Sequence, residues 1–373
     1  MNDQVSRIKI VFIIPTLGMG GAERVIVNLL RHLNRSKFEP VLIVLNFKDS
    51  VYLEDLPPDL MRFDLKCNRA RYALPKIIRL LWKLKPQVVF STIGNLNLWM
   101  AFIKPLLPPK TKYICRETTI LSEAFKFKSQ LDLRFWKWAY KTFFCRFEKI
   151  ICQSKYMRDD LVSSFGIPAE KTVIIYNPID IDRIRLLAAK PIDTGMSKMM
   201  ATQAGSPVIN IVAAGRMVYA KGFDLLIEAL ALSNNPAILL TILGDGQLRG
   251  ELEALANKLG VAGQVRFAGY QKNPYPFFRQ ADAFVLSSRY EGFPNVLLEA
   301  IACGTPVIAT PAKGGTLELL DNLEGCLMTN SISSTSLAEA LASFSYGKRL
   351  PLNTGEPYAI GKIIKLYEQQ FSN

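Results

Sequence analysis

What the sequence lacks excludes several kinds of protein. Its one histidine, His32, lies inside an expected helix, and its six cysteines have neither the spacing of metal ligands nor the density of a disulfide scaffold. The apolar run Ile10–Ile14 is too short for a signal peptide, and the uncharged stretch Pro86–Ile103 holds too many polar residues to span a bilayer. We therefore expect a cytoplasmic protein with reduced thiols, no metal site and no bound cofactor.

Acidic residues are fewer than basic residues in the first half of the chain only. Residues 1–189 carry 31 Lys and Arg against 17 Asp and Glu, whereas residues 190–373 carry 15 of each, so the net charge of +14 belongs entirely to the first half. This asymmetry predicts an anionic partner for the first half: nucleic acid, an anionic membrane surface or a phosphate-bearing lipid. No nucleic-acid recognition motif accompanies the charge, so we expect no nucleic acid among the partners.

The most informative stretch is Glu291-Gly-Phe-Pro-Asn-Val-Leu-Leu-Glu299. An apolar strand is expected before it at 281–288, glycine and proline then break the chain, and a helical pattern follows at 295–303. A helix N-terminus binds anions, most often phosphate, and a carboxylate close to it is better suited to hydroxyls. A nucleotide-sugar offers both phosphate and hydroxyl groups. Spacing alone is equally compatible with Glu291 as a helix-dipole acid and Glu299 as a surface salt-bridge partner.

Together with its flanks, from Tyr290 to Ala309, this stretch resembles the signature of the retaining GT-B glycosyltransferases of family 4. Two further stretches resemble motifs of the same family. Gly215-Arg216 followed by Lys221-Gly222 matches its Gly-Arg…Lys-Gly motif, and the loop 18–23, Gly-Met-Gly-Gly-Ala-Glu, looks like its first loop. The strand, Asn and Arg-Glu pattern of the first half resembles a subgroup that builds bacterial surface glycans.

The resemblance implies the GT-B fold, in which two doubly wound, Rossmann-like α/β domains with parallel sheets face each other across a cleft. We place an N-terminal acceptor-binding domain at 1–180, a hinge and flexible connection at 181–206, and a C-terminal nucleotide-sugar-binding domain at 207–356. The last helix, within 357–373, often crosses back to the first domain in this fold. The implied reaction moves a hexose or N-acetylhexosamine from a nucleotide diphosphate sugar to a glycan acceptor, which we expect to be lipid-linked.

The resemblance also assigns roles to single residues. Arg216 and Lys221 would stabilise the departing diphosphate, since cationic side chains suit the charge that grows there. Glu291 would hold hydroxyls of the donor sugar, and no metal or covalent nucleophile would be needed, with the anomeric configuration retained. The nucleotide-sugar would contact a wider set of residues: Gly20, Gly21, Gly215, Gly269, Phe293, Pro294, Asn295, Val296 and, at the ribose, Glu299.

Many family members carry a histidine in the first domain that contacts the donor sugar. Here the only histidine is His32, which we interpret as a surface or packing residue. We therefore assign the acceptor side of the site to Asn95, Arg116 and Glu117, which follow two expected strands.

Residues 125–150 are both basic and aromatic. A helix with this composition can lie in a membrane interface, which favours a peripheral protein on the inner face of the plasma membrane. The same pattern is also typical of a helix that packs its aromatic face on a sheet and exposes a basic face. The aromatic residues expected at the contact are Trp136, Tyr140, Phe143, Phe144 and Phe147.

Two other functions remain compatible with the sequence. Another GT-B enzyme, such as a nucleotide-sugar epimerase, would share the donor-binding motifs. A basic nucleic-acid-binding protein would explain the isoelectric point of about 9.4.

Overall fold

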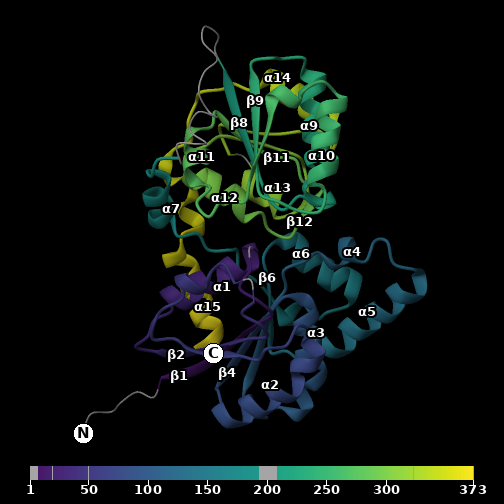
Figure 1. Cartoon of the computed structure of the whole chain (residues 1–373). Coiled ribbons are helices and arrows are strands. Elements are labelled where there is room, and N and C mark those ends of the chain that lie inside the picture. The colour runs from purple at the N-terminus through teal and green to yellow at the C-terminus, as the bar shows by residue number, and fades with distance from the viewer. Residues whose placement is uncertain (1–6, 19, 49, 193–207, 322, 373) are drawn as a thin grey trace. The chain divides into compact units, whose positions relative to one another are not determined.

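The computed structural model of the chain (Figure 1) describes residues 7–18, 20–48, 50–192, 208–321 and 323–372. The chain forms two compact units. The first consists of Met1–Pro178 together with Ile360–Asn373, and the second of Ile179–Ala359. Each unit is built on one main parallel sheet, which confirms the predicted class of two doubly wound α/β domains.

The first unit is centred on a seven-stranded parallel sheet with the order β3-β2-β1-β4-β5-β6-β7. The order reverses between β1 and β4, and such a switch point opens a crevice at the carboxyl ends of the strands. The strands are β1 (Ile8–Ile14), β2 (Phe38–Val44), β3 (Met61–Asp64), β4 (Val88–Thr92), β5 (Lys112–Arg116), β6 (Lys149–Cys152) and β7 (Thr172–Ile174).

Apolar side chains cover both faces of this sheet. Along β1, Val11 and Ile13 join one core cluster while Ile10, Phe12 and Ile14 join the other, as the alternation of a buried strand requires. Helices α2, α3 and α5 contribute to the first cluster, and α1 and α15 to the second. The helices of the unit are α1 (Gly21–His32), α2 (Ala70–Leu84), α3 (Gly94–Ile103), α4 (Leu121–Ala124), α5 (Gln130–Phe144), α6 (Lys155–Asp159) and α15 (Ile360–Ser372).

The C-terminal helix α15 is an integral part of the first unit. Its Phe371 makes edge-to-face contacts with Phe12 and Phe90 at centroid distances of 6.0 and 5.5 Å. Tyr367 packs on Phe90 in the same way at 5.9 Å, and both side chains of α15 are buried. The chain thus leaves the first unit after Pro178 and re-enters it at Ile360.

The aromatic residues expected to meet a membrane, on α5 and in the turn after it, instead face inward. Tyr140, Phe144 and Phe147 are buried in the first core cluster, and Trp136 and Phe143 pack against it. The sheet offers these rings more apolar contact than an interface would, so the packing interpretation applies to this face. His32 lies on the surface, as expected, with Nδ1 2.9 Å from the carbonyl oxygen of Asn28.

The second unit repeats the same topology. Its six-stranded parallel sheet has the order β10-β9-β8-β11-β13-β15, so the switch point lies between β8 and β11. A separate pair of short strands, β12 and β14, is also parallel. The strands are β8 (Ile209–Ala214), β9 (Ile238–Leu243), β10 (Val265–Gly269), β11 (Ala283–Leu286), β12 (Tyr290–Glu291), β13 (Val307–Ala309), β14 (Lys313–Gly314) and β15 (Cys326–Met328).

One helix of the second unit falls where a flexible connection was expected. Residues Ile181–Ala188 form α7, whose N-cap Asp180 accepts a hydrogen bond from the amide of Arg183, and whose Ile181, Ile184 and Ala188 are buried. This capped, amphipathic helix packs against α11 and α12. Of the remaining expected connection, residues 193–206 lie outside the described residues. The other helices are α9 (Phe223–Ser233), α10 (Arg249–Lys258), α11 (Tyr275–Gln280), α12 (Asn295–Ala302), α13 (Gly315–Leu320) and α14 (Ser334–Ser343).

Candidate functional site

The carboxyl edge of the second sheet gathers the motif residues on either side of its switch point. Gly215 and Arg216 follow β8, and Ser287 and Ser288 follow β11. Lys221 ends a single 3-10 turn, Tyr219–Lys221, that leads into α9. This edge is where open parallel sheets bind ligands.

An ion pair joins two of the predicted catalytic residues. The Nζ atom of Lys221 lies 2.6 Å from Oε1 of Glu291, and the Ser288 hydroxyl donates to the same oxygen at 2.6 Å. Glu291 is 8% exposed, so its charge is largely shielded from water. Two donors therefore fix this carboxylate, whose remaining lone pairs suit hydroxyl groups of a ligand.

The backbone around Lys221 fits closely against the end of β11. Gly222 has a φ of +60°, and any side chain there would overlap the carbonyl oxygen of Ser287. The Ser287 hydroxyl donates to the carbonyl oxygen of Lys221 at 2.9 Å. These two contacts position the ammonium group toward Glu291.

A second ion pair, which the sequence did not reveal, clamps the same turn. Arg289 donates to both carboxylate oxygens of Asp224, at 2.8 and 2.5 Å, and to the carbonyl oxygen of Tyr219 at 2.8 Å. Its guanidinium also lies 4.1 Å from the centroid of the Tyr219 ring. Burial alone would raise the pKa of Asp224, but the bonds from Arg289 lower it overall. Arg289 thereby ties the loop of Glu291 to the turn of Lys221.

Glu291 itself belongs to β12, which pairs with β14 through Glu291 and Gly314. The loop after it places Phe293 against Gly315, where any side chain would overlap the ring. Pro294 is the N-cap of α12, which begins at Asn295, as the helical pattern predicted. The amide of Asn295 donates to the carbonyl oxygen of Phe293 at 3.0 Å, so a phosphate bound by this amide would replace that bond.

The other residues predicted to bind the donor lie on α12, at the end of β10 and after β8. Glu299 lies on α12 and is buried, so it is not the exposed surface residue that spacing alone allowed. Val296 is half-buried on the first turn of the same helix. Gly269 ends β10 with a φ of +68°, and its carbonyl oxygen accepts from the amide of Gly244 at 2.7 Å. Arg216 is exposed, and no side-chain bond fixes it within the part of the chain that the structure describes.

The first unit carries its own set of predicted residues at its switch point. Gly20 is the N-cap of α1, and its amide donates to the carbonyl oxygen of Gly18 at 2.9 Å. The carboxylate of Glu23 lies over Gly20, where a larger residue would overlap it, and Gly21 begins the helix. The negative charge of an acid at a helix N-terminus interacts favourably with the helix dipole.

The predicted acceptor residues divide into one exposed and two buried. Asn95 is exposed on the first turn of α3, whereas Arg116 and Glu117 are fully buried at the end of β5. Arg116 donates to Oδ1 of Asn177 at 2.5 Å, next to the exit from the unit. Asn97 donates to the carbonyl oxygen of Arg116 at 2.9 Å. Arg116 and Glu117 therefore act within the unit, and only Asn95 offers a side chain to solvent.

Glu117 is a buried acid close to this edge. Its Oε1 accepts from the amides of Thr118 and Thr119 at 2.9 and 3.3 Å. Burial raises its pKa to about 7, although these bonds and Arg116 oppose the rise.

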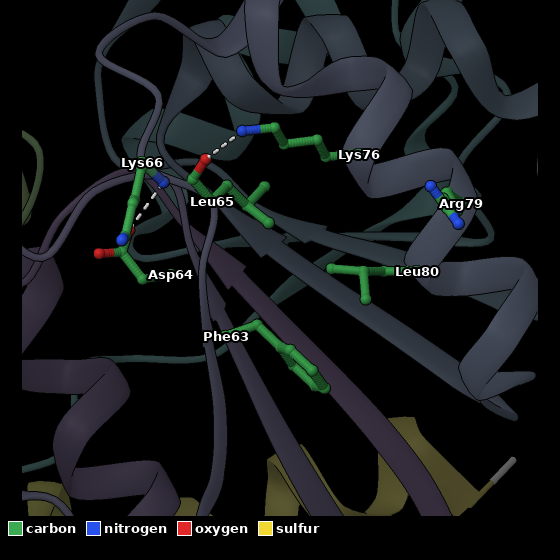
Figure 2. A pocket seen from close by; sticks show the side chains of 7 residues that line it. All are labelled: Phe63, Asp64, Leu65, Lys66, Lys76, Arg79 and Leu80. Atoms are coloured by element: carbon green, nitrogen blue, oxygen red, sulfur yellow. Dashed lines mark hydrogen bonds between the residues drawn. The ribbon is translucent and has the colours of Figure 1, made fainter.

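A shallow hollow of about 270 Å³ lies elsewhere in the first unit, between β3 and α2. Figure 2 shows Lys76 reaching to the carbonyl oxygen of Leu65, at 2.7 Å, with Arg79 and Leu80 on the neighbouring turn of α2. The hollow holds no residue predicted for the site. Within the described ranges there is no cluster of three or more His, Cys, Asp or Glu suited to a metal, and no helix long and apolar enough to cross a membrane.

Two family models match the chain. Residues 19–183 match "Glycosyltransferase Family 4", and residues 203–356 match "Glycosyl transferases group 1". The two matched regions contain the motif residues of the first and second units described above.

Curated relatives agree with these matches. The chain is 30% identical over 343 residues to an N-acetylgalactosamine-N,N'-diacetylbacillosaminyl-diphospho-undecaprenol 4-alpha-N-acetylgalactosaminyltransferase of Campylobacter jejuni, covering 89% of both chains. It is also 44% identical over 127 residues to the lipopolysaccharide core biosynthesis glycosyltransferase LpsE of Rhizobium meliloti, covering 34% of this chain and 36% of that one.

Solved structures share the fold. The chain superposes on HepE of Anabaena, solved in complex with UDP-glucose, with a TM-score of 0.78, 20% identity and coverage of 98% and 100% of the two chains. Similarity to a curated enzyme over 89% of the chain, the two family matches and the two Rossmann-like units lead to one conclusion: this protein is a member of the family 4 glycosyltransferases.

Proposed function

We propose that this protein transfers a hexose or N-acetylhexosamine from a nucleotide diphosphate sugar to a lipid-linked glycan during synthesis of a bacterial surface polysaccharide. The name of the Campylobacter relative specifies a diphospho-undecaprenol-linked acceptor, and that of the Rhizobium relative specifies lipopolysaccharide core synthesis. The HepE structure contains UDP-glucose, which supports a nucleotide-sugar as donor.

The observation that carries the proposal is the ion pair between Lys221 and Glu291, fixed by Ser288 at the switch point of the second sheet. The proposed donor sugar lies against Glu291, which accepts hydrogen bonds from its hydroxyls. Lys221 and the exposed Arg216 meet the diphosphate, whose charge grows as the glycosidic bond breaks. Stabilising that charge in the transition state more than in the ground state accelerates the reaction.

Two finer features complete the proposal. Arg216 and Lys221 supply the positive charge that a divalent cation supplies in other enzymes, so the transfer proceeds without a metal. The carboxylate of Glu291 is bound to Lys221 and Ser288, an arrangement suited to holding hydroxyls rather than attacking the sugar. The resemblance implies retention of the anomeric configuration, and without a protein nucleophile retention requires the acceptor to attack on the face from which the diphosphate leaves.

The acceptor determines where the protein works. A lipid-linked glycan is confined to a membrane, and the excess positive charge of residues 1–189 favours the anionic inner face of the plasma membrane. We propose a cytoplasmic protein that binds this face peripherally through its first unit.

The experiment is a screen of nucleotide diphosphate sugars against a lipid-linked acceptor extracted from bacteria. Mass spectrometry should detect one sugar added with one preferred donor, and NMR of the product should show the anomeric configuration of that donor. The rate should persist in EDTA. No transfer from any donor would refute the proposal, an inverted product would refute retention, and loss of activity in EDTA would refute metal independence.

A further inference from the structure

Helix α5 has a second apolar face, opposite the face that packs on the sheet. Leu131, Phe135 and Trp138 are spaced four and three residues apart, which places them on one side of the helix. They are 78%, 56% and 56% exposed, whereas Tyr140 and Phe144 on the opposite side are buried. A helix that is apolar on two opposite sides is typical of one that packs against two partners.

This exposed face continues onto helix α3, which packs beside α5 in the first unit (Figure 1). Ring centroids lie 5.9 Å apart for Trp99 and Phe102, 5.5 Å for Phe102 and Phe143, and 5.8 Å for Phe143 and Trp138. Phe127, on the turn before α5, is 83% exposed. We call this set the aromatic surface: Trp99, Phe102, Phe127, Leu131, Phe135 and Trp138.

Cations border the aromatic surface. Arg134, Lys137 and Lys141 follow one flank of α5 at intervals of three and four residues, and all three are exposed. Lys126 and Lys128 lie on the turn before the helix, also exposed. The acids of the same segment are Asp132, whose carboxylate accepts from the N-cap Ser129, and the buried Glu123, which pairs with Lys126 at 3.8 Å. The segment is therefore strongly positive around an exposed apolar face.

We propose that the aromatic surface inserts into the interface of an anionic bilayer, with the five cations on the lipid headgroups. Exposed Trp and Phe with flanking Lys and Arg match the chemistry of that interface, where aromatic rings lie at headgroup depth and basic side chains meet lipid phosphates. This inference rests on the proposed function, because a lipid-linked acceptor requires the first unit to reach a membrane.

Charge argues against a second copy of this chain as the occupant. In a symmetric dimer the same patch meets itself, so Arg134, Lys137 and Lys141 would face their own copies. Like charges brought together in this way oppose association, whereas anionic headgroups neutralise them.

The test measures binding of the full chain to vesicles of phosphatidylcholine with and without phosphatidylglycerol. One variant, Phe135→Ser with Trp138→Ser, removes apolar contact, and a second, Lys137→Gln with Lys141→Gln, removes charge. Tyr72→Ser, an exposed aromatic on α2, is the matched control. Thermal melting confirms that each variant folds as the wild type does.

We expect the wild type to sediment with anionic vesicles and each double variant to bind at least about tenfold more weakly, with the Tyr72 control unchanged. Lipids brominated in the acyl chain should quench the wild-type tryptophan fluorescence, and Trp138→Phe should remove much of that quenching. Unchanged vesicle binding by the Phe135/Trp138 variant would overturn the inference. So would a wild-type dimer that this variant dissociates.

Activity separates the failure of this inference from that of the proposed function. With a water-soluble short-chain acceptor all variants should turn over at the wild-type rate, and with a vesicle-embedded acceptor only the surface variants should slow. Vesicle binding that depends on the aromatic surface, without transfer to either acceptor, would refute the proposed function and uphold the surface. Transfer to the embedded acceptor at the wild-type rate by every variant would uphold the proposed function and refute the role of the aromatic surface.

Discussion

Lys221 and Glu291 depend on each other at the scale of single residues. With Nζ and Oε1 2.6 Å apart, neither charge is left without a partner in the partly buried site. Lys221→Ala should therefore lower kcat/KM through a loss of about 2–4 kcal/mol of transition-state stabilisation, the usual effect of removing one donor from a developing anion. Steady-state kinetics with saturating acceptor measure this loss.

Arg216→Ala should cost a similar ~2–4 kcal/mol, because its guanidinium is proposed to meet the same diphosphate. Lys348, which pairs with Glu324 on the surface of the same unit, provides the control. Lys348→Ala should leave kcat/KM unchanged. Near-wild-type turnover of the Lys221 or Arg216 variant would mean that the diphosphate binds elsewhere.

In the proposed account Ser288 positions Glu291. Ser288→Ala removes a 2.6 Å hydrogen bond to the carboxylate and should cost about 0.5–1.5 kcal/mol, seen as a raised KM for the donor. Ser288→Thr keeps the hydroxyl and should restore part of the affinity. Ser343→Ala removes a surface hydroxyl that donates to the carbonyl oxygen of Glu339, and it should leave the KM for the donor and kcat unchanged. A lower kcat at unchanged KM would assign Ser288 a different role.

At the scale of elements, buried Glu117 links stability to pH. Its pKa is about 7 in the folded chain, above the ordinary value of 4.5, so the folded state keeps the proton longer. Between about pH 4.5 and pH 7 the unfolded chain releases this proton first, and stability falls as pH rises. Glu117→Gln removes this contribution, which is on the order of 3 kcal/mol at most.

Urea unfolding at pH 5 and pH 8 measures the effect. Relative to the wild type, Glu117→Gln should be more stable at pH 8 than at pH 5. Glu339 is an exposed acid on α14, and Glu339→Gln should change the free energy of unfolding by the same amount at pH 5 and pH 8. An equal effect of Glu117→Gln at both pH values would mean that Glu117 is ionised throughout.

Most elements could be predicted from the sequence because their patterns are local. The strand expected at 281–288 is present as β11 and the helix expected at 295–303 as α12, because an apolar run between breaks and a helical period are local patterns. The clamp of Arg289 could not be predicted, because it joins the loop after β11 to the turn and helix after β8. The bond from Ser288 to Glu291, three residues away, depends on a loop conformation that the residue pattern does not specify. The orientation of α5 also depends on tertiary packing, since both of its sides carry aromatic residues.

At the scale of the whole molecule, the last helix couples the C-terminus to the first unit. Phe371 is buried between Phe12, Phe38 and Phe90. Phe371→Ala should destabilise the protein by about 3–5 kcal/mol, the cost of emptying an aromatic core site. Leu366→Ala, on the exposed side of the same helix, should cost much less. Equal losses in urea unfolding would show that α15 does not pack as described.

The proposed function gives a reason for the charge of the chain. The excess of basic residues in the first half left a nucleic-acid-binding protein open, but the chain is a family 4 glycosyltransferase. In the proposed account this charge serves a membrane and a phosphate-bearing lipid. In the second unit Lys221 and Glu291, from two of the motifs that the resemblance identified, lie in contact, while the donor and acceptor roles of the site residues stay predictions.

The central claim is that the Lys221–Glu291 site transfers a sugar to an acceptor. Its most direct test is the release of nucleoside diphosphate from the preferred donor, measured with and without the lipid-linked acceptor. The account predicts release only when acceptor is present, equal in amount to the sugar transferred, and abolished in Glu291→Ala. Conversion of the donor sugar without acceptor, as an epimerase would perform, or full release by the Glu291 variant, would contradict it.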